Sequence, residues 1–206
     1  MLKTVLNFII FKGGFDLNKV GVVGVVLALI GLFLPWWEIN LSVCETVNSW
    51  VTGNREATIW WSAGISVYPY QITKNSPTLR AIAIRIIPFL YFVLPLIVIG
   101  ILLGVAGCIT GDEKKEEILL ILAGSLTLFS TIMFIFVLQV ELLVAPPAIH
   151  FFGLMHAVPI PKVGIFSNGG STFEGTSLYY SSYLSIGFWL TVIAAAVILY
   201  ASRKHA

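Results

Sequence analysis

Three histidines are the residues best able to hold a metal ion or a haem. His150 and His156 are six residues apart, and His205 lies near the carboxyl end. Two imidazoles share one face of a helix when they are three or four residues apart, and no pair here has that spacing. The four long apolar segments of the chain contain no histidine, which disfavours a haem between membrane helices. The sequence therefore predicts no metal site and no cofactor.

Acidic residues offer two further places for chemistry. Glu141, with Gln139 two positions before it, lies closest to membrane depth and is a candidate for a proton or ion role. The favoured alternative is that Glu141 reaches to the membrane surface or pairs with Arg85. The mixed run Asp112–Glu117 is expected to be a solvated turn and helix cap. No phosphate-binding glycine loop, nucleophile elbow or carboxylate pair occurs, so we expect no catalytic residues.

The two cysteines, Cys44 and Cys108, allow one disulfide at most. Cys44 follows the first apolar segment, whereas Cys108 lies near the far end of the second. If both segments cross the membrane, the two thiols lie a membrane thickness apart, and we expect no bond between them. Both are more simply small apolar residues, and an intermolecular disulfide through Cys44 stays open.

The composition defines the broad class of protein. Of the 206 residues, 58% are hydrophobic and 11% are charged. Soluble domains carry about a quarter charged residues, because their surface faces water. This composition excludes a soluble enzyme and predicts a membrane protein whose surroundings are lipid. The net charge of +2 is spread along the chain, so we expect no nucleic-acid partner, and no small-molecule substrate is evident.

Segments that lack charge over the length of a membrane helix define the architecture. A bilayer core of about 30 Å needs about 20 mostly apolar residues in a helix. Residues 142–161 also lack charge, but prolines interrupt them and predict a loop. We expect a single integral membrane domain, 1–206, with four spans at residues 20–37, 86–110, 118–142 and 183–201.

The distribution of lysine and arginine predicts the orientation. Seven basic residues fall on the side of the two termini, and five fall on the other side in two long loops, 38–85 and 143–182. The excess of positive charge marks the cytoplasmic side. We therefore predict a multi-pass protein of the cell membrane with both termini in the cytoplasm. The first eleven residues lack a cleavage site and are expected to lie as an amphipathic segment on the inner surface.

The two outer loops carry patterns typical of strands. Residues 38–43, 57–61 and 64–73 alternate polar residues with β-branched or aromatic ones. In the second loop, Lys162–Phe166 and Ser171–Glu174 flank the residues Ser167–Gly170, which predicts a hairpin with its turn at the two glycines. The expected fold is an all-α membrane bundle of four transmembrane helices. A small extracellular antiparallel β-sheet is built from both outer loops.

A few residues resemble the claudin and peripheral-myelin-protein superfamily. The first span ends in Leu34-Pro35-Trp36-Trp37, a second Trp pair follows at Trp60-Trp61, and Arg80 and Arg85 precede the second span. That superfamily has a Trp after its first span, a Gly-Leu-Trp motif before two loop cysteines, and an Arg before its second span. This chain lacks the Gly-Leu, and its one loop cysteine, Cys44, precedes the motif position. The resemblance implies four helices and an outer sheet.

Small residues recur in all four segments, and they allow helix backbones to approach closely. Gly100 and Gly104 have the spacing of a packing motif, and we expect such glycines to pack within the bundle of one chain. Aromatic residues gather near the outer ends of the spans. Five of them are at positions typical of an interfacial belt, namely Trp36, Trp37, Tyr179, Tyr180 and Tyr183.

From these features we predict a non-enzymatic membrane protein with a structural, scaffolding or adhesion role. Its outer β-rich part would bind another copy or another membrane protein, because Trp and Tyr offer large contact areas. The alternative is an accessory subunit of a larger respiratory, oxidase or transport complex. A third hypothesis, a small transporter, depends on Glu141.

Overall fold

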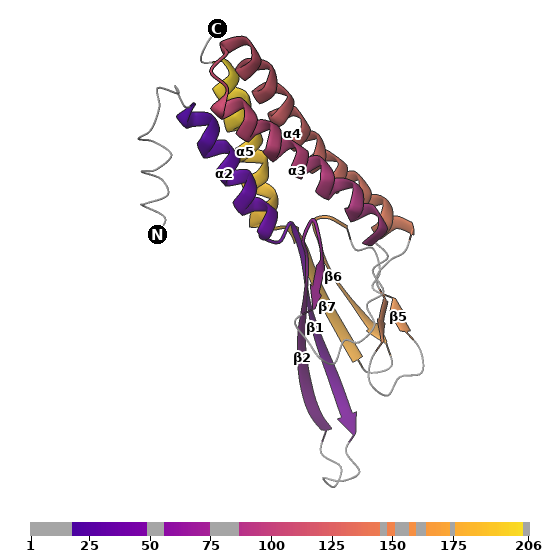
Figure 1. Ribbon diagram of the computed structural model, residues 1–206. Coiled ribbons are helices and arrows are strands. Elements are labelled where there is room, and N and C mark those ends of the chain that lie inside the picture. Colours follow the sequence, from indigo (N-terminus) through magenta and orange to yellow (C-terminus); the bar gives the residue numbers. More distant parts are fainter. Residues whose placement is uncertain are drawn as a thin grey trace.

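The computed structural model of the chain describes residues 18–48, 56–74, 87–144, 148–150, 157–159, 164–173 and 176–203. In this part of the chain, four helices form a bundle, and a five-stranded antiparallel sheet extends from one end of it (Figure 1). The first and the last described residues lie at the other end. The helices are α2 (Lys19–Phe33), α3 (Ile87–Ile109), α4 (Glu113–Val144) and α5 (Ile186–Ser202).

The four helices differ in length. Within the described residues, α3 and α4 are long and apolar enough to cross a membrane, with candidate spans at Phe92–Ile109 and Glu113–Val140. With 15 and 17 residues, α2 and α5 extend about 22 and 26 Å. Both are apolar but shorter than a bilayer core of about 30 Å. Length and composition thus give a weak indication of a membrane protein and identify two of its helices as candidate spans.

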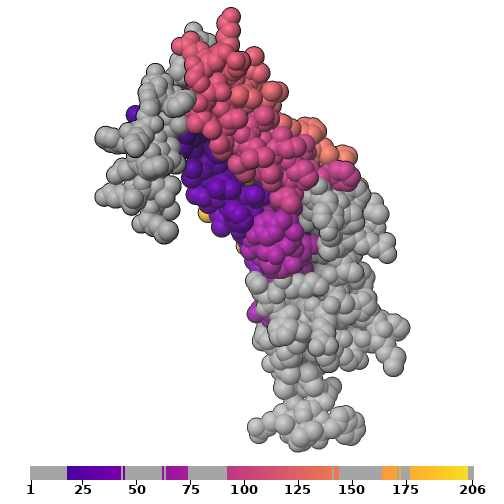
Figure 2. All heavy atoms as spheres, viewed as in Figure 1, coloured from indigo at the N-terminus to yellow at the C-terminus, as the bar shows by residue number. Residues whose placement is uncertain are grey.

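The helices form a closed bundle in which α2 packs on α5, α5 on α4, α4 on α3 and α3 on α2. Figure 2 shows α2 and α3 side by side on one face. Glycines lie at the contacts: a Cβ on Gly24 would lie 2.6 Å from the side chain of Ile198, and one on Gly100 would lie 2.7 Å from Oγ1 of Thr127. These glycines pack within the bundle of one chain, as predicted.

The sheet has the strand order β3-β2-β1-β7-β6, and both of the segments that were predicted as outer loops contribute to it. The central strand β1 pairs with β2 along one edge and with β7 along the other. The prediction of one sheet from two segments is therefore confirmed. The strands are β1 (Trp37–Asn48), β2 (Glu56–Val67), β3 (Ile72–Lys74), β6 (Ser167–Phe173) and β7 (Thr176–Leu184), while β4 (Ala148–His150) and β5 (Ala157–Pro159) form a separate pair.

One face of the sheet joins the main hydrophobic core. Because side chains alternate along a strand, Ile39 and Leu41 of β1 point to the same face as Leu178 and Tyr180 of β7, and all four are buried. They form one cluster with side chains at the sheet end of α3 and α4, among them Val93, Ile97, Phe134, Leu138 and Leu142. This shared core joins sheet and bundle into one unit.

The predicted hairpin at residues 162–174 is wrong, because its predicted turn lies within a strand. The two glycines predicted at the turn, Gly169 and Gly170, lie inside β6, opposite Tyr180 and Tyr179 of β7. A Cβ on Gly169 would lie 2.5 Å from the hydroxyl oxygen of Tyr180. These positions leave room for tyrosine rings that cross from the neighbouring strand, a known use of glycine in sheets.

Two of the predicted spans have different boundaries in the structure. The first, 20–37, is helical only to Phe33, because Pro35 has no N–H to continue the helix and Trp37 already belongs to β1. The last, 183–201, begins as helix at Ile186, because Tyr183 is the penultimate residue of β7. Helix α3 matches the predicted 86–110 closely, and α4 extends beyond 118–142 at both ends.

Candidate functional site

Two tryptophans lie at the junction between the bundle and the sheet. Trp36 and Trp37 are both 0% exposed. The indole Nε1 of Trp36 donates to the carbonyl of Gly31 at 2.9 Å, and that of Trp37 donates to Ile165 at 3.1 Å. The ring of Trp36 meets Phe134 edge to face, with centroids 5.0 Å apart. The prediction that these tryptophans belong to an interfacial belt is therefore wrong, since the fold encloses both rings.

The backbone passes from helix to strand with its polar groups paired. The N–H of Trp36 donates to Val67 at 2.8 Å, and the N–H of Ser185 donates to Trp36 at 2.9 Å. Gly187, in the first turn of α5, donates to Pro35 at 2.9 Å. Unpaired backbone groups are costly where water is absent. The α2–α5 pair thus continues directly into the β1–β7 pair.

Glu38 fixes the first residues of the sheet to α5. Its Oε1 accepts a hydrogen bond from Ser66 at 3.1 Å, and its Oε2 accepts one from Ser185 at 2.8 Å. Ser185 immediately precedes α5, and the N-terminal end of a helix favours a nearby negative charge. Because both carboxylate oxygens accept hydrogen bonds from serines of the fold, we interpret Glu38 as a residue that holds β1, β2 and the start of α5 together.

The side of the sheet that carries Glu38 presents exposed tyrosines among small polar residues. Tyr179 is 53% exposed and Tyr183 is 38% exposed, and Asn40 on the neighbouring strand donates to the hydroxyl of Tyr183 at 3.4 Å. We call this surface the tyrosine face. The register places on it Asn40 and Ser42 of β1, Ser62 of β2, Asn168, Gly170 and Thr172 of β6, and Ser177, Tyr179, Ser181 and Tyr183 of β7.

The composition of the tyrosine face suits binding to another protein. Tyrosine provides a large, rigid contact area, whereas serine, asparagine and glycine provide adaptable hydrogen bonds, a combination also used by antibody loops. No described strand pairs with the far edge of β6, so its polar backbone groups flank this face.

A buried polar cluster joins three helices at the end of the bundle away from the sheet. Asn18 caps α2 by accepting from the N–H of Gly21 at 2.9 Å, and its amide donates to Glu116 at 2.7 Å and to the carbonyl of Ala201 at 3.3 Å. Glu116 is 4% exposed. The expectation that the whole run 112–117 is solvated is therefore wrong at this residue.

The other charges described at this end behave as expected. Asp112 and Lys115 are exposed, and Nζ of Lys115 lies 3.1 Å from Oδ2 of Asp112. The hydrogen bond from Lys115 lowers the pKa of Asp112. Such surface pairs contribute little to stability.

Most of the remaining sequence candidates lie outside the described part of the chain. Glu141 belongs to α4 and His150 to β4, but their side chains are outside the described part, as are residues 1–17, His156 and His205. Cys44 is half-buried in β1 and Cys108 is buried near the end of α3, and both are free thiols. The described residues contain no group of three or more His, Cys, Asp or Glu arranged to hold a metal ion.

The fold and its surfaces define a helix-bundle protein with a terminal antiparallel sheet and a membrane-compatible composition. No protein-family model matches the chain, and no curated protein shows significant similarity to it. Any functional conclusion must therefore come from the chain's own residues.

Sequence reasoning missed two contacts for which weak signals exist. Asn18 and Ser185 each stand immediately before an apolar helix, where such residues are common caps, although only the side chain of Asn18 makes a capping hydrogen bond. Their distant partners, Glu116 and Glu38, have no such signal, because the pairing depends on how the helices and strands meet.

Proposed function

We propose that the chain is a non-enzymatic integral membrane protein that crosses the bilayer four times and acts as a scaffold or adhesion protein through the tyrosine face. In architecture it would resemble the claudin and peripheral-myelin-protein superfamily. The observation that carries the proposal is the exposure of Tyr179 and Tyr183 on a polar sheet face, at the opposite end of the molecule from the charged helix ends.

The packing of the bundle supports four spans. Helices α2 and α5 lie along each other and contact the candidate spans α3 and α4, so they share the depth of those spans. Their outward side chains are large and apolar, including Leu29, Phe33, Trp189 and Ile193. Such a surface is suited to lipid. Although α2 and α5 are shorter than a bilayer core, the chain beyond their sheet ends is buried and hydrogen-bonded at Trp36. This junction can therefore span the remaining thickness of the bilayer.

The charges support an orientation with the sheet outside. Among the described residues, Lys19, Lys114, Lys115 and Arg203 lie at the helix ends away from the sheet, whereas Lys74 lies at the sheet end. Lysine and arginine near span ends favour the cytoplasmic side.

Cysteine labelling is expected to distinguish four spans from two. In a background that lacks both native cysteines and carries Tyr179→Ser/Tyr183→Ser, so that no partner covers the tyrosine face, a membrane-impermeant maleimide should label Ser62→Cys on intact cells, because Ser62 is exposed on the sheet. It should label Lys114→Cys only after permeabilisation. Leu29→Cys, at a position 45% exposed on the protein surface, should react only after denaturation, because lipid covers it.

Two outcomes would contradict the topology. Reaction of Leu29→Cys in native membranes would place α2 outside the bilayer and leave two spans. Labelling of Lys114→Cys, but not Ser62→Cys, on intact cells would reverse the orientation.

Replacement of the two exposed tyrosines tests the recognition role. Native mass spectrometry of protein released gently from its own membrane should show a homo-oligomer. The double variant Tyr179→Ser/Tyr183→Ser should lower the association constant at least about tenfold, because interface tyrosines often contribute more than 1 kcal/mol each. Tyr70→Ser is the matched control, since Tyr70 is 40% exposed but lies outside the tyrosine face.

The alternative role, an accessory subunit of a larger complex, predicts a different native mass spectrum. A fixed assembly with other subunits, and no homo-oligomer, would identify an accessory subunit and overturn the proposal of self-assembly. A homo-oligomer unaffected by the double variant would place the interface elsewhere.

A further inference from the structure

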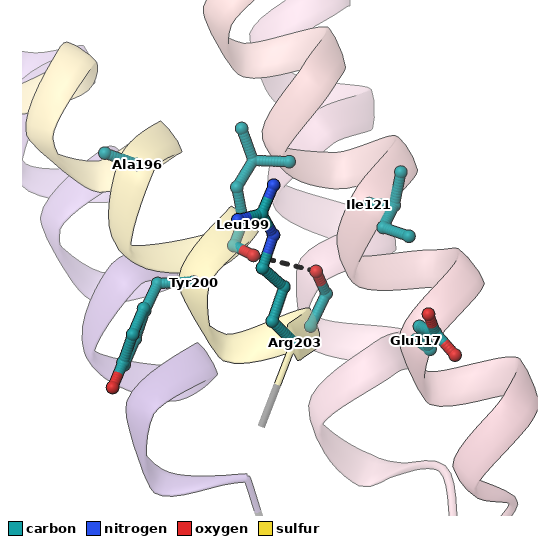
Figure 3. A pocket seen from close by; sticks show the side chains of 7 residues that line it. Glu117, Ile121, Ala196, Leu199, Tyr200 and Arg203 are labelled. Atoms are coloured by element: carbon teal, nitrogen blue, oxygen red, sulfur yellow. Dashed lines mark hydrogen bonds between the residues drawn. The ribbon is translucent and has the colours of Figure 1, made fainter. Parts of the chain in front are cut away.

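A groove opens between α4 and α5 at the end of the bundle away from the sheet (Figure 3). Its volume is about 460 Å³. Both helices contribute to its walls, which are formed by Glu117, Ile121, Ala196, Leu199, Tyr200, Ser202 and Arg203. The lining therefore combines two charged residues with mostly apolar ones.

The two charged residues that line the groove form no salt bridge with each other within the described chain. Glu117 comes from α4 and Arg203 follows α5. Figure 3 shows the Arg203 side chain running back along α5 toward the level of Leu199. The guanidinium thus lines the same groove as the apolar side chains of Ile121 and Leu199, where a counter-charge from a ligand would be favourable.

We propose that this groove binds one phospholipid whose headgroup carries both a phosphate and a primary ammonium group. The phosphate would accept hydrogen bonds from Arg203, whose planar guanidinium suits phosphate oxygens. The ammonium would donate to Glu117. One acyl chain would lie along the wall formed by Ile121 and Leu199. The inference rests on the membrane placement proposed above, but not on the tyrosine face.

The pair of opposite charges is what selects this headgroup. Arg203 alone would favour any phosphate, and anionic lipids most of all. Glu117 disfavours a net negative headgroup through like-charge repulsion, and it offers an acceptor that only an N–H donor uses fully. A choline headgroup has no N–H group, so it should bind more weakly than ethanolamine.

Lipid retention tests the proposal. Delipidated full-length protein in mild detergent is mixed with phosphatidylethanolamine, phosphatidylcholine or phosphatidylglycerol of identical chains, and bound lipid is counted by native mass spectrometry. We expect the ethanolamine lipid to bind about tenfold more tightly than the other two, as a charge-assisted hydrogen bond allows. Arg203→Gln should remove most binding. Glu117→Gln should abolish the preference over phosphatidylglycerol.

Two further variants keep the test decisive. Lys114→Gln is the matched control, because Lys114 is an exposed cation at the same end but does not line the groove. It should leave binding unchanged. Ile121→Trp fills the groove from an exposed, lipid-facing position and should weaken binding of all three lipids. Equal retention of the three lipids by the natural sequence, or equal losses in Lys114→Gln and Arg203→Gln, would overturn the proposal. Because labelling topology and oligomer state are measured separately, failure here leaves those results standing.

Discussion

Replacing Trp36 with alanine is expected to lower the free energy of unfolding by about 3–5 kcal/mol, the usual loss for a large aromatic side chain removed from a core. Trp36 is fully buried and packs against Phe134 of α4 and Phe188 of α5. Its removal leaves a cavity where three elements meet. Unfolding in mixed micelles with increasing SDS, followed by far-UV circular dichroism, measures the change without relying on indole fluorescence.

Two other variants separate packing from hydrogen bonding at this junction. Trp36→Phe keeps most of the ring contact but loses the bond to the carbonyl of Gly31, and it should cost about 1 kcal/mol. Trp189→Ala removes an indole of equal size that is half exposed, so its effect should be the smaller one. Equal losses for Trp36→Ala and Trp189→Ala would show that Trp36 does not support the core.

The helices and the sheet were predictable because their residue patterns are local. Uncharged segments of helix length identified α3 and α4, and alternation of polar and apolar residues indicated strands in both segments between the predicted spans. The lack of charge does not distinguish helix from buried strand, however. The predicted spans therefore include Trp37 and Tyr183, although both belong to strands of the sheet.

The candidate site was predictable only in its composition. The sequence placed aromatic residues on the outer side, but whether each is exposed depends on strand register. Tyr179 and Tyr180 are neighbours in β7 and point to opposite faces, so one is exposed and the other buried. Glu116 is a similar case, since its burial depends on Asn18, which is 98 positions earlier in the chain.

Substitution of Gly187 by valine should disrupt the junction from the other side. A Cβ at Gly187 would lie 2.5 Å from the carbonyl oxygen of Leu34 and 2.6 Å from that of Pro35. Both obstacles are backbone atoms, so the start of α5 must move away and the bond from Gly187 N–H to Pro35 is lost. We expect a loss of about 3 kcal/mol, near the upper end for overpacking, measured in the same mixed-micelle titration.

Gly111 provides the matched control for this effect. It lies in the short turn between α3 and α4, and a Cβ there would have no heavy atom within 4 Å. Gly111→Val should therefore change stability by less than about 0.5 kcal/mol, as is typical of exposed sites. Because Gly187 joins the bundle to β1, its variant should also weaken association through the tyrosine face, whereas Gly111→Val should not. Normal stability of Gly187→Val would mean that sheet and bundle are not joined through this contact, and that the tyrosine face is positioned by the shared hydrophobic core alone.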